Sequence, residues 1–366
     1  MSSFEAVLKD PDQFIAAVPA MLGFVPERSL VVVAMHHEAG QRYAVKVAVR
    51  LDIPPAQQYA PLPEHLPRIC RNSDADLVLA VLVDDRAARP DAGGDATALG
   101  QRRLVDRLRR ALAGGDVVLA GAWATPRITA GAEWWDIDSP ERHGLVPDPA
   151  ASQVAAKSVL DGRVLRASRR ELVDAIAVDG ALREQVSAYL PTAVADAQRR
   201  LARAIQIDNP DAYTRMALCQ VLSVITRTPG SEVSASVIAD VAVALRDLPV
   251  RDIMFGVAGG AHAHAAEQLW EVLTRALPDP DRAQAATLLA FSAFLRGDGP
   301  LAGIALKQAL TSDPDHRMAG LLDTALQMAL PPARLRRLVD TGVEAAAELR
   351  VDIGATVPDS GLGVTR

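Results

Sequence analysis

The feature that most constrains this fold is the confinement of strand-like apolar runs to the first 140 of its 366 residues. Four runs of strand length occur there, at residues 30–34, 43–51, 75–83 and 117–124. Helix-like segments lie between some of them, and from about Ser168 to residue 350 only helical periodicity remains. The pattern predicts an α/β N-terminal half followed by an all-helical C-terminal half.

The first half is expected to contain a mixed β-sheet with flanking helices, over residues 1–150. Residues 43–51 alternate between apolar and polar side chains, as a half-buried strand does, and are expected to form an antiparallel hairpin with residues 30–34. Residues 75–83 and 117–124 are further strands, and residues 127–138, which carry Trp134 and Trp135, are expected to return as another.

Helices are predicted over residues 11–22, 61–71 and 98–113. The first has clear end signals: Asp10 at the N-cap, Pro11 at the first helical position, Gln13 at capping-box spacing, and Gly23 as the stop. The third has an apolar stripe for burial, and its many arginines are expected to form a solvated face. That stripe consists of Leu104, Val105, Leu108 and Leu112.

The second half, residues 151–350, is expected to be a compact helical domain. Ser168 and Glu171 form a capping box that opens a helix. Asp279-Pro280-Asp281 recurs 34 residues later as Asp313-Pro314-Asp315, a spacing that resembles the tetratricopeptide helix pair. Tetratricopeptide-like helix hairpins are therefore predicted there. Residues 351–366, which are rich in Gly, Asp, Ser and Pro, are expected to be a disordered tail.

Composition narrows the partners and the compartment. A net charge of −6 and a pI near 5.7 are not what a general nucleic-acid binder needs, so nucleic acid is not an expected partner. The two cysteines, Cys70 and Cys219, are too few for a disulfide framework or a multi-cysteine zinc site. The chain has no apolar run long enough for a membrane span, and its first nine residues do not resemble a signal peptide. We expect a cytoplasmic location without membrane contact.

Arg28 and Ser29 are the first candidate ligand-binding residues, in the turn between the first helix and the first strand. A guidanine group at Arg28 suits a carboxylate or a phosphate. The turn also has a structural reason to exist, because Gly23 ends the helix and Pro26 fixes the exit of the chain. Moreover, it enters a strand at the N-terminal end, whereas ligands in open α/β sheets gather at carboxyl ends. The structural interpretation is therefore favoured for this turn.

His36, His37, Asp84 and Asp85 are the second candidate set, because they follow two predicted strands. If those strands are parallel neighbours, the two imidazoles and two carboxylates converge, and they could bind a divalent metal or perform acid–base catalysis. The alternative is that they are ordinary polar residues at exposed strand ends.

The absent motifs favour a protein without a cofactor. The chain has no phosphate-binding P-loop, no dinucleotide fingerprint and no nucleophile elbow. The leading hypothesis is a non-enzymatic module that binds an unknown protein partner or a small molecule, without a metal. The alternative is a metal-dependent or acid–base enzyme with its site at the strand carboxyl ends. A third possibility is a sensor with its ligand between the two halves.

Three separated segments resemble an actinobacterial family of unknown function, DUF4192. They are FIAAVPAMLGFVPERSLVVV at residues 14–33, PDPAASQVAAKSVLDGRVLRASRRELV at 147–173 and LLAFSAFLRGDGPLAGIALKQALTSDPD at 288–315. The resemblance implies an actinobacterial source and a cytoplasmic location, and it implies no activity. Members often carry a cysteine pair before the middle segment, but residues 135–144 contain none here. No metal or redox role is expected for that loop.

Overall fold

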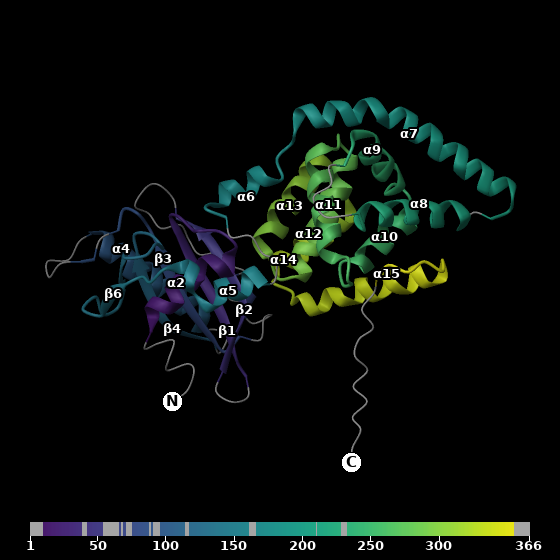
Figure 1. Cartoon of the computed structure of the whole chain (residues 1–366). Helices are drawn as coiled ribbons and strands as arrows, with labels where there is room; N and C mark the ends of the chain where they lie inside the picture. Colours follow the sequence, from purple (N-terminus) through teal and green to yellow (C-terminus); the bar gives the residue numbers. More distant parts are fainter. Residues whose placement is uncertain are drawn as a thin grey trace, which may run out of the picture. The chain divides into compact units, whose positions relative to one another are not determined.

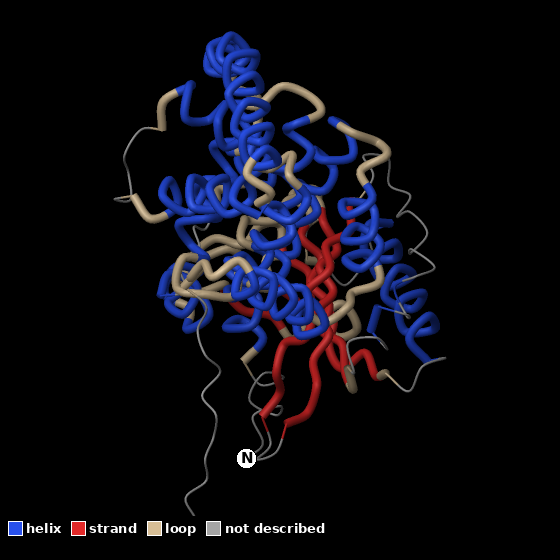
Figure 2. Tube along the Cα trace, turned by 90° about the vertical axis from the view of Figure 1, so that its right-hand side faces the viewer, coloured by secondary structure: helices blue, strands red, loops and turns tan. Residues whose placement is uncertain are grey.

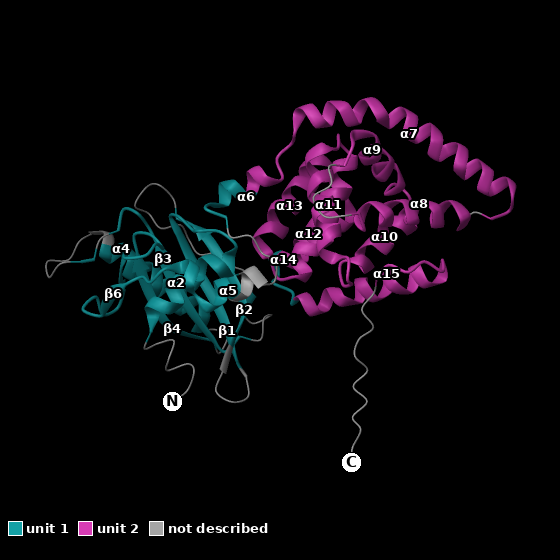
Figure 3. Ribbon diagram, viewed as in Figure 1, with its two compact units in different colours: residues 1–172, 327–331 teal, residues 173–326, 332–366 magenta. Residues whose placement is uncertain are grey.

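The computed structural model describes residues 10–38, 42–53, 66, 69–70, 75–87, 89–90, 96–113, 117–160, 166–209, 211–227 and 233–354. The chain divides into two compact units, residues 1–172 with 327–331 and residues 173–326 with 332–366 (Figure 3). All described strands belong to the first unit, and the second is helical. Figure 2 shows the strands in red and the helices in blue. The predicted class, a mixed sheet with flanking helices followed by a helical half, is confirmed.

The first unit contains a six-stranded mixed sheet with the order β2-β1-β3-β4-β5-β6 (Figure 1). Its strands are β1 (Ser29–Glu38), β2 (Arg42–Asp52), β3 (Leu77–Val83), β4 (Val118–Thr125), β5 (Glu133–Asp136) and β6 (His143–Leu145). The predicted β1–β2 hairpin is antiparallel, as expected. Strand β1 also pairs antiparallel with β3, whereas β3 and β4 are parallel.

Helices cover both faces of this sheet, which explains why its central strands are apolar on both sides. Every residue of β3 is buried, with odd-numbered residues in one core and even-numbered residues in the other. Helix α2 (Pro11–Leu22) packs on one face, and helix α4 (Ala96–Ala113) packs on the other. The stripe predicted for α4 is confirmed, since all four of its residues are buried: Leu104, Val105, Leu108 and Leu112. The helix predicted over residues 61–71 lies mostly outside the described residues.

The end signals of α2 act through backbone geometry. Asp10 is the N-cap and Pro11 is the first helical residue, as predicted, but the Asp10 side chain makes no capping hydrogen bond. Gly23 ends the helix at φ +76°, a left-handed conformation that glycine adopts without strain. After the sheet, the short 3₁₀ turn η1 (Pro149–Ala151) and helix α5 (Gln153–Leu160) pack against α2. The turn η1 spans the predicted boundary at residue 150, and α5 follows it; both lie within the first unit.

The second unit is built around α12, most of whose residues are buried. Helices α10 (Leu248–Val257), α11 (Ala263–Ala276) and α13 (Gly299–Ser312) pack against it. The rings of Phe255 and Phe291 lie edge to face, with their centroids 4.8 Å apart. Helix α6 begins in the first unit. The Ser168 hydroxyl accepts the Glu171 backbone N–H, which is one half of the predicted capping box, whereas the Glu171 carboxylate accepts from Ala167 N instead of Ser168 N. The helices are α6 (Arg169–Ala175), α7 (Gly180–Gln206), α8 (Asp211–Ile225), α9 (Ala235–Ala244), α10 (Leu248–Val257), α11 (Ala263–Ala276), α12 (Asp281–Leu295), α13 (Gly299–Ser312), α14 (Arg317–Gln327) and α15 (Arg336–Glu348), with the 3₁₀ turn η2 (Pro332–Leu335).

The Asp-Pro-Asp sequence that recurs after 34 residues lies at the start of two helices. Helix α12 begins directly after Asp279-Pro280, and α14 begins three residues after Asp313-Pro314. The structure does not confirm the predicted tetratricopeptide-like hairpins. Of the tail expected to be disordered, residues 351–354 are described: Ile353 is buried, and the Gly354 carbonyl accepts a hydrogen bond from Ala261 N. Residues 355–366 lie outside the described residues.

Candidate functional site at the carboxyl edge of the sheet

The direction of β1 decides which candidate residues meet. Because β1 runs antiparallel to β3, its first residue, Ser29, is paired with Val83 at the carboxyl end of β3. Val83 is in turn paired with Thr125 at the carboxyl end of β4. The turn that carries Arg28 therefore lies at the sheet edge where ligands of open α/β sheets gather. The topological argument that disfavoured this turn does not hold.

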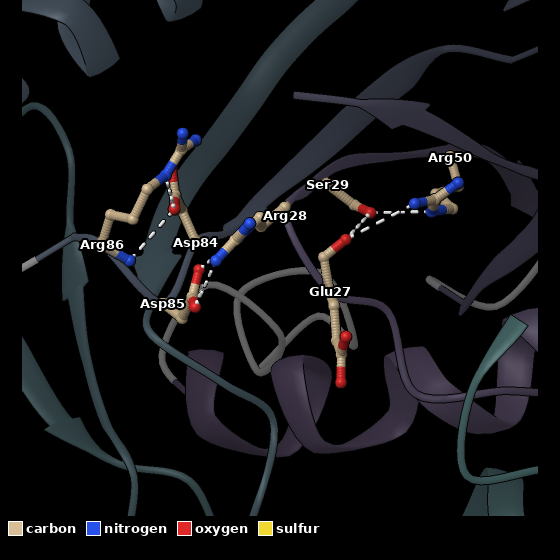
Figure 4. A network of polar contacts seen from close by, with 7 residues as sticks. All are labelled: Glu27, Arg28, Ser29, Arg50, Asp84, Asp85 and Arg86. Atoms are coloured by element: carbon tan, nitrogen blue, oxygen red, sulfur yellow. Dashed lines mark hydrogen bonds and ion pairs between the residues drawn. The ribbon is translucent and has the colours of Figure 1, made fainter. Parts of the chain in front are cut away.

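Arg28 and Asp85 face each other across this edge in a two-point contact (Figure 4). The Arg28 Nε lies 2.7 Å from Asp85 Oδ1, and Nη2 lies 3.0 Å from Oδ2. Hydrogen bonding from Arg28 lowers the pKa of the Asp85 carboxyl, and the same bond raises the pKa of Arg28. Both side chains are more than half exposed, at 53% and 59%. Arg28 also has φ +42°, which is unusual for a residue other than glycine.

Ser29 serves as a support rather than as an open ligand group. It is fully buried, and its hydroxyl donates to the Glu27 carbonyl at 2.6 Å. The same oxygen accepts from Arg50 Nε at 2.7 Å. Arg50 comes from β2 and also reaches the Asp52 carboxylate. These contacts fix the turn that presents Arg28 (Figure 4).

Asp84 is held in a similar way, although it is adjacent to the exposed Asp85. Its side chain is 3% exposed. Its Oδ1 accepts from the Arg86 backbone N–H and from Arg86 Nε, and its Oδ2 accepts from Arg86 Nη2 at 2.8 Å. A buried carboxylate needs such charge-assisted partners. Asp84 therefore stabilises the loop after β3, and Asp85 is left as the accessible carboxylate.

His36 and His37 lie at the opposite end of β1, which corrects the predicted convergence. It required β1 and β3 to be parallel, but they are antiparallel neighbours. Seven residues separate Ser29 from His36, or about 23 Å at roughly 3.3 Å per residue. The histidines instead meet Asp76, just before β3: the His37 backbone N–H donates to its Oδ2, and His36 Nδ1 lies 3.0 Å from that atom.

The site therefore contains one exposed guanidine group paired with one exposed carboxylate. Within the part of the chain that the structure describes, no three metal-ligating side chains are grouped to hold an ion. Sequence reasoning missed Arg50 and Arg86, which order Ser29 and Asp84. Nothing in the sequence singled out Arg50, because Lys46 and Asp52 lie on the same polar face of the strand; the signal for Arg86 was an arginine two residues after an aspartate.

None of the described helices combines the length and the apolar character needed to cross a membrane.

Comparison with known proteins gives a family but no activity. Neither the curated proteins nor the solved structures contain a match to the chain. One family profile matches residues 11–333, which is most of the sequence, and its description is "Domain of unknown function (DUF4192)". The chain therefore belongs to the DUF4192 family.

Proposed function

We propose that this chain is a non-enzymatic ligand-binding module in which Arg28 binds an anionic group, a carboxylate or a phosphate. The observation that carries the proposal is the two-point contact between Arg28 and Asp85. A carboxylate of the chain already occupies the position that a ligand's carboxylate would take. The guanidine fork matches the paired oxygens of both carboxylates and phosphates.

Exchange of Asp85 for an external anion is physically easy. Both partners are more than half exposed, so water already competes with their contact. Ion pairs in such positions contribute little to stability. Ser29 and Arg50 hold the turn independently of Asp85, so Arg28 stays in place when its partner changes.

Catalysis has less support than binding at this edge. Asp85 is kept ionised by Arg28, and a carboxylate with a lowered pKa is a poor general acid near neutral pH. Asp84 is engaged by Arg86, and Ser29 by Arg50. The alternative of a metal-dependent or acid–base enzyme relied on the histidines, which lie at the other end of β1. The protein-partner form of the leading hypothesis relied on tetratricopeptide-like hairpins, which the helical unit does not confirm.

Two substitutions with opposite expected effects test the proposal by calorimetric titration of the full chain with inorganic phosphate and with succinate. Arg28→Gln should abolish binding of whichever anion the wild type binds. Asp85→Asn should tighten that binding a few-fold, because it removes the internal competitor. The matched control is Asp138→Asn, which removes an exposed carboxylate from a pair with Arg109 elsewhere in the unit.

The proposal fails if neither anion binds the wild type. It also fails if Arg28→Gln binds as the wild type does, or if Asp85→Asn weakens binding. Circular dichroism of each variant confirms that its fold is retained.

A further inference from the structure

A polar hollow lies in the first unit, between the start of α2 and the β5–β6 hairpin. Its volume is about 320 Å³. Asp12, in the first turn of α2, lines one part of it, and Arg142 and His143, at the start of β6, line another. Pro11, Leu145 and Trp134 complete the wall with apolar surface. This volume lies at the small end of the range for small-molecule sites.

Gly144 also lines this hollow. Gly144 is paired with Trp134 across the β5–β6 hairpin. A Cβ atom at residue 144 would lie only 3.0 Å from the indole Nε1, so the ring lies directly against the glycine backbone. Trp134 is 7% exposed, and its buried Nε1 has no hydrogen-bond partner among the described residues. Buried indole N–H groups usually have a partner, but the Nε1 atoms of Trp123 and Trp135 also have none among the described residues, so this donor is not peculiar to the hollow.

The charged groups of the hollow have opposite signs and do not neutralise each other. Within the described ranges, Asp12 forms no ion pair or side-chain hydrogen bond. Arg142 lies 3.6 Å from Asp136 Oδ2, and its side chain is 58% exposed. His143 Nδ1 lies 3.9 Å from Glu133 Oε1. Asp12, the carboxylate that shares the hollow with these two basic side chains, is therefore left for another partner.

Charge complementarity selects the ligand. A simple anion would be repelled by Asp12, and a simple cation would be repelled by Arg142. A molecule that carries both charges can place its anionic group near Arg142 and its cationic group near Asp12. We infer that this hollow binds a small zwitterion of the amino-acid class, with its carboxylate on Arg142 and His143 and its ammonium group on Asp12. The apolar part of the ligand then lies against Pro11 and Leu145. This site is separate from the carboxyl-edge site and does not depend on it.

Calorimetric titration of the full chain with each of the twenty L-amino acids tests the inference. Acetate and methylamine serve as probes that carry one charge each. At least one amino acid should bind, and both single-charge probes should bind about ten-fold more weakly or not at all, because each loses one charge-assisted contact. Asp12→Asn and Arg142→Gln should each weaken amino-acid binding by about the same factor.

Two further variants sharpen the result. Leu145→Trp should block binding by filling the hollow, and the fold should tolerate it because Leu145 is 63% exposed. Arg103→Gln, an exposed arginine on α4, should bind as the wild type does. The inference is overturned if no amino acid binds or if acetate binds as tightly as the best amino acid. Unchanged binding in Asp12→Asn also overturns it, since a site for anions alone would behave in that way.

Discussion

Replacing Gly342 by alanine should destabilise the helical unit, although alanine is ordinarily the better helix residue. Gly342 lies in α15, at the point where this helix crosses α10 beside Gly256. A Cβ atom at residue 342 would lie 2.6 Å from Gly256 N, 2.9 Å from Gly256 Cα and 3.1 Å from the Asp252 carbonyl oxygen. All three obstacles are backbone atoms, so no side chain can rotate away.

The magnitude follows from two opposing effects. Alanine in a helix interior gains up to about 1 kcal/mol over glycine. Against this, the shortest contact has to grow from 2.6 Å to at least 3.4 Å before it becomes ordinary van der Waals contact, which separates the two helices. Overpacking of this kind costs about 1–3 kcal/mol. Because all three obstacles are backbone atoms, we take the cost in the upper part of this range, about 2–3 kcal/mol, which leaves a net loss of about 1–2 kcal/mol. This corresponds to a fall in melting temperature of about 2–8 °C for a unit of this size.

Thermal and urea unfolding followed by circular dichroism measures the loss, and amide hydrogen exchange in α10 and α15 locates it. The matched control is Gly320→Ala in α14, where a Cβ atom meets nothing within 4 Å. That variant should gain about 0.5–1 kcal/mol from helix propensity alone. If Gly342→Ala is as stable as the wild type, or gains stability as Gly320→Ala does, the close helix crossing is refuted.

Two further predictions concern burial. Asp84→Asn should lower the free energy of unfolding by about 1–3 kcal/mol, because it replaces the charge-assisted hydrogen bonds between the buried Asp84 carboxylate and Arg86 with neutral ones. Asp85→Asn should leave the urea midpoint almost unchanged, and equal effects at the two positions would contradict the burial difference. Burial lowers the pKa of His316, so the protonated form is favoured in the unfolded chain. The stability that His316 contributes is present above the unfolded value near pH 6.5 and is lost as the pH falls towards the folded value. Urea midpoints measured across this window should fall more in the wild type than in His316→Asn, which can still cap α14; parallel profiles would exclude His316 as the cause.

Local chemistry allowed much of the fold to be predicted. The strands, α2 and α4 were found because apolar periodicity and backbone constraints act within a few residues. Pro11 fits a first helical position, and Gly23 fits a left-handed stop, whatever lies elsewhere in the chain. The short strand β6 was missed, because three residues carry too little periodicity to be recognised. The tetratricopeptide spacing was a weaker guide, since it predicted helix starts without determining how the helices pack.

The site formed by Arg28 and Asp85 at the carboxyl ends of the strands depends on contacts that local sequence patterns do not determine. The sequence by itself determined that Arg28 precedes a strand and that Asp84 and Asp85 follow one. It did not determine that these two strands are antiparallel neighbours, because pairing between distant segments depends on how both faces of the whole sheet are covered. The tertiary structure decided that Arg28, rather than His36, faces Asp85. It also decided, through burial, that Asp85 is the open carboxylate and Asp84 the structural one.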